Sequence, residues 1–326
     1  MKVRTIYIEK KVRDHPNTHK IIKNVQSRKI IYCDSYSEIF NTNNQNFRIQ
    51  KKVPTLILAK KENNFLYKAP KSFTIGYSNN YYFSHMLNCP YDCQYCYLQG
   101  SLNSSNYLIF VNYEDFFKAM QYIVQNNNKV SCFFSGYESD NLALEKVTNF
   151  LENFIHNFKH LNKAFLEVRS KSVNIDIFKK IKPISNIIPA FSLNPQFIID
   201  AYEDKTPNLL KRLHAIKVLQ EYGWNVGLRF DPLIWFESKY RYQQFFNQVF
   251  SSINILRIHS VTLGNFRMPK DFLKKIAKIS PNNQLVQKNL IRQIFDNDQD
   301  ITDKFGREYC LDQIKRYVPE EKVFLN

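Results

Sequence analysis

Residues 186–234 read NIIPAFSLNPQFIIDAYEDKTPNLLKRLHAIKVLQEYGWNVGLRFDPLI. We expect strands at 186–194 and 225–234, where β-branched and aromatic residues are concentrated, and a helix between them at 206–223. A strand, a helix and a second strand in this order form the repeating unit of folds with a parallel sheet. This stretch therefore predicts an α/β protein.

The same alternation extends along most of the chain in both directions. Further strands are expected at 72–85, 129–137, 163–171 and 255–264. Further helices are expected at 113–125, 141–158, 174–181 and 239–250. Six β–α units in a row are compatible with a doubly wound sheet or with a partly or fully closed barrel.

The ends of the strands favour the barrel. Polar or small residues close nearly every strand: Ser135-Gly136, Arg169-Ser170-Lys171, Ser192-Leu193-Asn194, Asp231-Pro232 and His259-Ser260. All strand ends converge on one site in a barrel, whereas a doubly wound sheet uses only the loops at its switch point. We predict an α/β fold with a partial (β/α)6 TIM-like barrel.

Three regions are expected on this basis. An N-terminal α/β extension spans 1–70, the barrel spans 71–266, and a mainly helical, basic segment spans 267–326. The last segment could cover one mouth of the barrel or hold nucleic acid. Within the extension, residues 41–52 (NTNNQNFRIQKK) are predicted to form a polar loop.

The net charge favours a polyanionic partner. The chain has 46 lysines and arginines against 29 aspartates and glutamates, which gives a formal charge of +17. Such a surplus strengthens binding to phosphates, although biased codon usage would produce the same composition. No apolar run is long enough to span a membrane and no signal peptide is recognisable, so we expect a cytoplasmic protein with no membrane partner.

Three of the six cysteines lie within residues 88–100, NCPYDCQYCYLQG. Clustered thiols in a long chain are more often metal ligands than disulfides. A structural zinc site normally needs a fourth protein ligand, and no further Cys or His follows at the usual distance. Three thiolates instead leave one iron of a [4Fe–4S] cluster open to a small molecule. The cysteine stretch therefore predicts such a cluster.

The spacing CxxxCxxC resembles the signature of the radical S-adenosylmethionine (SAM) superfamily. Within it, CQYCYLQG is similar to the spore photoproduct lyase family, as are IYIEKKVRDHP, NYLIFVNYEDFF and residues 192–234. The resemblance implies a DNA repair lyase that reverses thymine photodimers, with a [4Fe–4S] cluster and SAM as cofactors. SAM would be split to methionine and a 5′-deoxyadenosyl radical. It also implies DNA and a reductant such as flavodoxin or ferredoxin as partners.

The resemblance also assigns residues. Cys89, Cys93 and Cys96 match the cluster ligands. Tyr95 and Tyr97 match two family tyrosines, one beside the adenine of SAM and one that relays a hydrogen atom. The SAM contacts of the family are matched by the following residues: Glu138, Ser139, Lys171, Ser192 and Asn194.

One departure concerns the hydrogen donor. Tyr137 aligns with the cysteine that returns hydrogen to the product in the family, and Cys132 lies five residues earlier within a strand. Either Tyr137 or Tyr97 takes over that role, or the reaction differs. The C-terminal hairpin that family members use against DNA is not clearly present. Two alternatives therefore stay open: a related enzyme that consumes SAM on another nucleic acid or small substrate, and a basic nucleic-acid-binding protein with a structural metal.

Isolated histidines and basic residues are interpreted more plainly. We expect structural roles for His85, His214 and His259, which have no ligand spacing. Arg257, Arg267 and Lys270 are expected near the barrel mouth, as phosphate contacts or as solvated charges.

Overall fold

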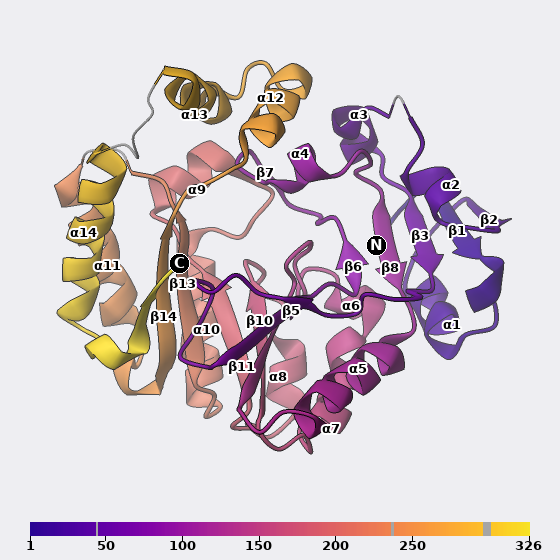
Figure 1. The fold of residues 1–326 in the computed structure, drawn as a ribbon, viewed down its shortest axis with the longest axis horizontal. Helices are drawn as coiled ribbons and strands as arrows, with labels where there is room; N and C mark the ends of the chain where they lie inside the picture. Colours follow the sequence, from indigo (N-terminus) through magenta and orange to yellow (C-terminus); the bar gives the residue numbers. More distant parts are fainter. Residues whose placement is uncertain (44, 236–237, 296–300) are drawn as a thin grey trace.

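A curved parallel sheet forms the centre of the computed structural model, which describes residues 1–43, 45–235, 238–295 and 301–326 (Figure 1). Its strands in spatial order are β15 (Val323–Leu325), β14 (Ile258–Asn265), β13 (Val226–Leu233), β11 (Ile187–Ser192), β10 (Ala164–Ser170), β9 (Ser131–Ser135), β5 (Asn79–Phe83) and β4 (Tyr67–Lys68). All neighbours pair in parallel except β4, which runs antiparallel to β5. The predicted six-unit partial barrel is therefore confirmed.

Helices cover the outer face of this sheet, as Figure 1 shows for the described residues. They are α5 (Tyr113–Gln125), α6 (Glu145–Thr148), α7 (Phe150–Phe158), α8 (Asp176–Lys180), α10 (Leu209–Glu221) and α11 (Lys239–Ser252). The short helix α9 (Gln196–Tyr202) lies instead at the carboxyl end of β11, where Ile198 packs with Cys93 and Tyr95. The sequence explains α10 locally, because the side chain of Asn208 accepts a hydrogen bond from the amide of Lys211 and caps the first turn. Leu209, Leu213 and Ile216 then recur on one face and are buried against the sheet.

A second sheet lies beside the barrel and contains strands from two parts of the chain. Its order is β2 (Lys29–Cys33), β1 (Thr5–Glu9), β3 (Leu56–Ala59), β8 (Tyr107–Phe110) and β6 (Met86–Leu87). β6 precedes the cysteine stretch and β8 follows it, so both ends of that stretch are held in this sheet. The chain division at residue 70 stays a prediction. The remaining elements of the extension are η1 (Lys10–Val12), α1 (Pro16–Lys23) and α2 (Ser37–Phe40).

Three local predictions were wrong. Residues 47–52 form helix α3 (Phe47–Lys52) within the predicted polar loop, because the Asn46 side chain accepts from the amide of Ile49, with an N–O distance of 3.0 Å, and Phe47 is buried. The strand predicted from residue 72 starts only at Asn79. The helix predicted at 141–158 is preceded by turns and divided at Asn149, which has a left-handed φ of 46°.

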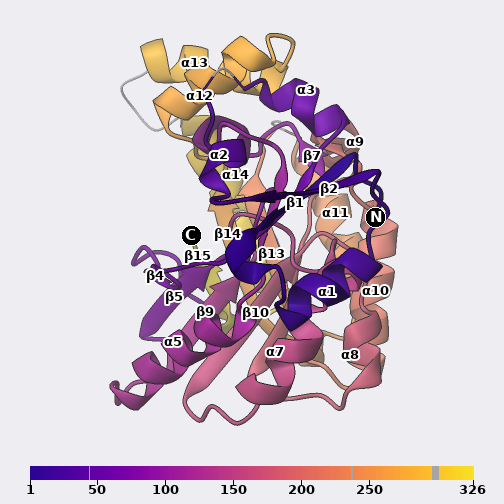
Figure 2. The same ribbon diagram turned by 90° about the vertical axis from the view of Figure 1, so that its right-hand side faces the viewer.

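The C-terminal segment covers the cysteine stretch and extends the sheet. It comprises α12 (Lys270–Ile279), α13 (Gln284–Phe295), α14 (Ile301–Lys315), η3 (Glu320–Lys322) and strand β15, and Figure 2 shows α12 and α13 above the barrel. α12 approaches α4 (Leu98–Ser101) closely at Gly100, where an added Cβ would lie 2.5 Å from the Cβ of Phe272. The glycine of CYLQG therefore permits this packing. Among the described helices, none is both long and apolar enough to cross a membrane.

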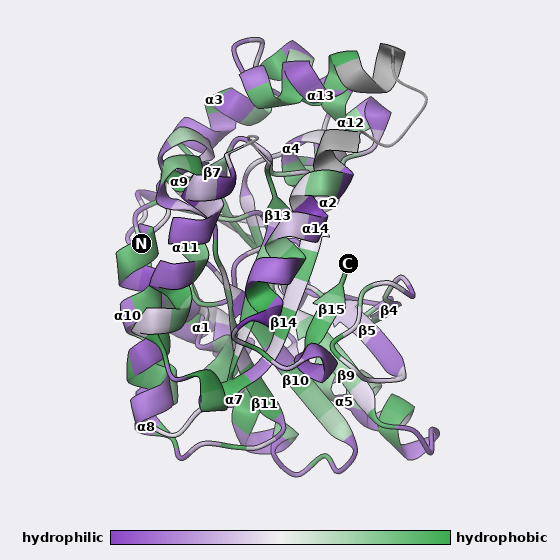
Figure 3. Cartoon of the chain, turned by 90° about the vertical axis from the view of Figure 1, so that its left-hand side faces the viewer, coloured by the Kyte–Doolittle hydropathy of each residue, from purple (hydrophilic) through white to green (hydrophobic). Residues whose placement is uncertain are grey.

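Many residues of the barrel strands are hydrophobic (Figure 3), but the barrel interior also contains a buried ion pair. Arg229 on β13 and Glu167 on β10 have no exposed side-chain surface, and their Nη2 and Oε2 atoms are 2.8 Å apart. Burial alone would raise the pKa of Glu167, but the guanidiniums of Arg229 and Arg169 outweigh it and hold the pKa at about 2. Gly227 leaves room for Arg229, because a Cβ there would lie 2.4 Å from Nη2 of that arginine.

We predict that His85 makes folding stability depend on pH. His85 is buried and stacks on Phe150, with ring centroids 3.7 Å apart, and burial lowers its pKa to about 3. An unfolded histidine titrates near 6.5, so only the unfolded chain gains this proton as the pH falls below that value. The free energy of unfolding should therefore fall with decreasing pH, by up to about 1.4 kcal/mol per pH unit from this group.

Urea unfolding from about pH 7 to about pH 5 would measure this slope. The His85→Phe variant should have a shallower slope than the wild type. His214 is exposed, and its replacement by Phe should leave the slope unchanged. Equal slopes in the wild type and His85→Phe would contradict the prediction.

Candidate active site at the mouth of the barrel

A cavity of about 530 Å³ lies where the cysteine stretch crosses the carboxyl ends of the barrel strands. It is lined by strand-end residues of β9, β10, β11 and β13 and by the following cysteine-stretch residues: Cys89, Tyr91, Cys93, Tyr95, Cys96, Tyr97 and Leu98. Of the predicted site residues, all except Glu138 and Asn194 line this cavity. The roles assigned to them stay predictions. The structure does bring together residues that are more than 100 positions apart, such as Cys89 and Ser192.

The cysteine stretch is held by contacts to three separate parts of the chain. β7 (Asp92–Cys93) pairs antiparallel with β12 (Glu203–Asp204), which places Cys93 opposite Glu203. Three side chains make further contacts with the stretch. Lys51 Nζ donates to the carbonyl of Cys89, and Arg48 Nη1 lies 2.6 Å from Asp92 Oδ1. Asn283 Nδ2 donates to the carbonyl of Gln94, with an N–O distance of 2.8 Å. Helix α3, which the sequence did not predict, supplies two of these anchors.

The three thiols suit an iron–sulfur cluster better than a single ion. Burial raises the pKa of Cys89, Cys93 and Cys96, and the ammonium groups of Lys51 and Lys171 act against this rise. A bound metal centre removes such protons outright. Within the described residues, no three Cys, His, Asp or Glu side chains converge on one ion-sized point. A cluster does not need such convergence, because each thiolate binds a different iron.

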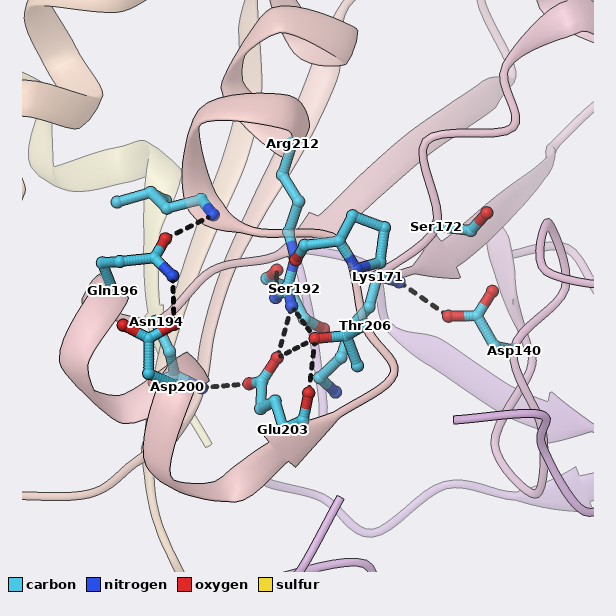
Figure 4. Close-up of polar contacts among 12 residues, drawn as sticks. Asp140, Lys171, Ser172, Ser192, Asn194, Gln196, Asp200, Glu203, Thr206 and Arg212 are labelled. Carbon is cyan, nitrogen blue, oxygen red and sulfur yellow. Dashed lines mark hydrogen bonds and ion pairs between the residues drawn. The ribbon is translucent and has the colours of Figure 1, made fainter. Parts of the chain in front are cut away.

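Glu203 is the centre of the polar network beneath the cysteine stretch (Figure 4). Its carboxylate accepts hydrogen bonds from the Tyr95 hydroxyl and from Asn194 Nδ2, the latter with an N–O distance of 2.9 Å. It also forms an ion pair with Arg212, and both side chains are fully buried. Burial would raise the pKa of Glu203, but the charges of Lys171 and Arg212 outweigh it and lower the pKa. The carboxylate is therefore charged and fully partnered.

Arg212 connects this network to the barrel. Its Nη1 donates to the carbonyl of Ser192 at the end of β11, with an N–O distance of 3.0 Å, and its Nε donates to the carbonyl of Pro207. Sequence reasoning missed both Glu203 and Arg212. They lie in the segment that resembles the family, but no metal-ligand or catalytic spacing distinguishes them there.

A second carboxylate orients the end of β10. Asp140 accepts from the Ser170 hydroxyl, with an O–O distance of 2.6 Å, and from the Lys171 amide, with an N–O distance of 2.7 Å. The Lys171 side chain is thereby directed toward Tyr95, and its Nζ lies 5.6 Å from the centroid of that ring. Burial opposes the charge on Lys171, but Cys93 and Glu203 outweigh it and raise the pKa. The cavity therefore has a permanent cation beside the cysteines.

Three buried polar atoms of cavity-lining residues have no hydrogen-bond partner within the described residues. They are Oγ of Ser139, Nη2 of Arg169 and Oδ1 of Asn326. Buried polar groups are normally hydrogen-bonded, so unpaired ones in a cavity wall point to a missing ligand. A hydroxyl, a guanidinium and the ammonium of Lys171 together fit a ligand that carries carboxylate or hydroxyl groups. The residues present therefore fit an anionic or hydroxyl-bearing cofactor.

The three predicted catalytic tyrosines have different surroundings. Tyr95 is buried and donates its hydroxyl hydrogen to Glu203. The Tyr97 hydroxyl donates to the carbonyl of Tyr137, with an O–O distance of 2.8 Å, and Tyr137 has an exposed fraction of 40%. The rings of Tyr97 and Tyr137 lie 5.7 Å apart. Tyr97 and Tyr137 are therefore neighbours, while Tyr95 belongs to the Glu203 network.

The other predicted residues are more scattered. Asn194 is buried against Glu203, and Glu138 is directed toward Ser84, so neither lines the cavity. Arg267 does line it. Arg257 was wrongly placed: it precedes β14, at the opposite end of the strand from the cavity, and donates to the carbonyl of Gly223. His259 lies 3.3 Å from the hydroxyl of Tyr77, in keeping with a structural role.

We predict that Glu203→Gln loosens the cysteine stretch. The substitution keeps the shape but leaves the buried Arg212 without its counter-charge, which should lower the free energy of unfolding by about 3–5 kcal/mol. Urea unfolding measures this loss, and iron bound after anaerobic reconstitution should fall in parallel. Glu221 is exposed on α10, and Glu221→Gln should change neither quantity. A Glu203→Gln variant as stable as the wild type would contradict the prediction.

Comparisons with known proteins agree with this geometry. The sequence model of the family described as spore photoproduct lyase matches residues 1–309. The spore photoproduct lyase of a Geobacillus species is 26% identical over 147 residues, which cover 44% of this chain and 43% of the relative. That of Bacillus subtilis is 25% identical over 202 residues, 60% of this chain and 59% of the relative. The matched segments thus span less than two thirds of each of these relatives.

Solved structures share the fold across nearly the whole chain. A mutant spore photoproduct lyase with bound AdoMet and dinucleoside spore photoproduct superposes with a TM-score of 0.78 at 17% identity, covering 99% of this chain and 98% of that one. A spore photoproduct lyase complexed with dinucleoside spore photoproduct has a TM-score of 0.78 at 18% identity, and the match covers the same shares of the two chains. The family match, the fold and the cysteine-lined cavity lead to one conclusion: this chain belongs to the spore photoproduct lyase family.

Proposed function

We propose that this protein is a radical SAM lyase that repairs spore photoproduct in DNA. The observation that carries the proposal is the cavity in which Cys89, Cys93 and Cys96 face the strand ends of a partial barrel. Relatives of this family are named for that activity, and one structural neighbour contains both AdoMet and the dinucleoside photoproduct. The cavity volume of about 530 Å³ falls in the usual range for small-molecule sites.

In this proposal the three cysteines hold a [4Fe–4S] cluster, and the open iron binds SAM. When bound, these groups supply the carbon-centred radical that starts the reaction. The chain itself binds and orients them. The ammonium of Lys171 pairs with the SAM carboxylate, and the hydroxyls of Ser139 and Ser192 contact its polar groups. Asn194 and Tyr95 act as positioning residues, because their polar groups are directed at Glu203.

Tyr137 is the proposed hydrogen donor for the product. It lines the cavity, is partly exposed, and occupies the position that aligns with the donor cysteine of the family. Tyr97 is adjacent and could exchange a hydrogen atom with it. A phenol suits this role because its O–H bond gives up hydrogen to form a stabilised radical.

Basic residues near the cavity support DNA as the partner. Arg267 lines the cavity and is exposed, exposed Lys71 lies between the lining residues Pro70 and Ser72, and the whole chain has a formal charge of +17. Phosphate contacts from such residues position a nucleic acid without reading its sequence. The electron donor is proposed to be an acidic carrier such as flavodoxin or ferredoxin. Such a carrier would approach from helix α3, which contacts the cysteine stretch directly and has exposed Lys52.

A second candidate function rests on Tyr137. Without a cysteine donor at this position, the same cavity could serve an enzyme that consumes SAM on another nucleic acid or small substrate. The two candidates differ in the fate of SAM. Repair with regeneration leaves little 5′-deoxyadenosine for each thymine dimer restored, whereas consumption releases one for each turnover.

The deciding experiment incubates the anaerobically reconstituted protein with SAM, dithionite and the dinucleoside spore photoproduct. We expect restored thymines and far less 5′-deoxyadenosine than product. Equal amounts of product and 5′-deoxyadenosine would favour the second candidate. No restored thymine, with SAM still cleaved, would rule out the photoproduct as substrate.

We also predict that Cys93→Ser abolishes cluster binding, because a serine hydroxyl is a far poorer ligand than a thiolate for iron–sulfur centres. Iron and sulfide analysis with the visible absorbance after anaerobic reconstitution is the measurement. Cys33 lies on β2 in the second sheet, outside the cavity lining, so Cys33→Ser should retain the cluster. Normal iron content in Cys93→Ser would remove this residue from the proposed ligand set.

A further inference from the structure

Four tyrosines form a continuous line from the cavity to the edge of the main sheet. Their ring centroids are 5.7 Å apart between Tyr97 and Tyr137, 4.4 Å between Tyr137 and Tyr82, and 5.3 Å between Tyr82 and Tyr67. Tyr97 and Tyr137 line the cavity. Tyr67 lies on β4 with an exposed fraction of 40%. The line therefore connects the reacting site with solvent.

Strand pairing holds the outer half of this line. Tyr67 and Tyr82 are directly opposite each other in the antiparallel β4–β5 pair, and their rings stack with an interplanar angle of 17°. Tyr82 in turn meets Tyr137, which follows the end of the neighbouring strand β9. Stacking would be satisfied equally by phenylalanine, which the chain uses nearby at Phe73 and Phe134. Packing alone does not explain the hydroxyl groups of Tyr82 and Tyr67.

Glu138 lies among these phenols. Burial raises the pKa of all four tyrosines, and the charge of Glu138 raises each of them further. The other groups facing Glu138 are Ser84, whose Oγ accepts from the Glu138 amide at 3.2 Å, and the ammonium of Lys61. Lys61 Nζ also lies 5.9 Å from the ring centroid of Tyr67. The raised pKa values keep these phenols protonated near neutral pH, so each of the four retains its O–H hydrogen.

We propose that Tyr82 and Tyr67 extend the hydrogen donor Tyr137 into a relay that carries a radical from the cavity to the protein surface. The inference rests on the proposed function. When Tyr137 has given its hydrogen atom to the product, its phenoxyl oxygen forms a new O–H bond as the O–H bond of Tyr82 breaks. The electron and the proton pass together between the two neighbouring rings, whose centroids are 4.4 Å apart. The same exchange between Tyr82 and Tyr67 places the radical at the surface.

A thiol in solution completes the balance. Its S–H bond breaks, the O–H bond of Tyr67 is restored, and two thiyl radicals combine into a disulfide. The relay thus quenches a radical on Tyr137 that is not transferred back through Tyr97. In this proposal Tyr137 takes part in radical transfer at the position where the family has a cysteine.

The test traps the radical in the full chain during turnover. Reconstituted protein receives SAM, dithionite, the dinucleoside photoproduct and a nitroso spin trap, and mass spectrometry locates the adducts. We expect an adduct on Tyr67 in the wild type. Tyr82→Phe keeps the ring stack and removes the O–H group, so the Tyr67 adduct should fall to the level found on Tyr122. That residue is 69% exposed on α5 and serves as the internal control for non-specific trapping.

Adduct levels are normalised to the 5′-deoxyadenosine formed, which separates the effect of Tyr82→Phe from any loss of SAM binding. If Tyr67 has the same adduct level in Tyr82→Phe as in the wild type, or none above Tyr122 while 5′-deoxyadenosine forms, the relay is wrong and the proposed function stands. If neither restored thymine nor 5′-deoxyadenosine forms, the proposed function fails together with the relay that rests on it.

Discussion

The buried carboxylate of Glu203 is the interaction on which the site depends. It accepts hydrogen bonds from the hydroxyl of Tyr95 in the cysteine stretch and from the side-chain amide of Asn194 after β11. It also forms an ion pair with the guanidinium of Arg212 on α10. A buried charge is tolerated only when its partners are complete, so this network forms either as a whole or not at all. The backbone pairing of Cys93 with Glu203 makes the same residue a structural support for the thiols.

Charge within the cavity follows from this arrangement. Lys171 is kept cationic by Glu203 and Cys93 and is oriented by Asp140, so a positive group faces the cysteines before any ligand binds. Preorganised charge of this kind binds an anionic group without further rearrangement. The helices of the C-terminal segment close the opposite side, where Gly100 lets α12 pack against α4. The cysteine stretch is thus held between a charged barrel mouth and an apolar cover.

Much of the fold could be predicted because its signals are local. The barrel strands and helices alternate with clear apolar patterns, and the strand ends are marked by polar residues such as Ser192 and Lys171. Helix α3 was missed because its six residues are mostly polar, and its formation depends on the Asn46 cap and the burial of Phe47. Lys51 and Arg48, which hold the cysteine stretch, were missed with it.

The sequence by itself determined the parallel α/β class, the number of barrel units and the three candidate cluster ligands, because periodicity and cysteine spacing are properties of neighbouring residues. Only the tertiary structure showed that Glu203 and Arg212 support those cysteines, that Glu138 and Asn194 lie outside the cavity lining, and that the rings of Tyr137 and Tyr82 are in contact. Contacts of this kind join residues far apart in the chain. They depend on how the sheet curves and how its loops cross, and the pattern of neighbouring residues does not predict either.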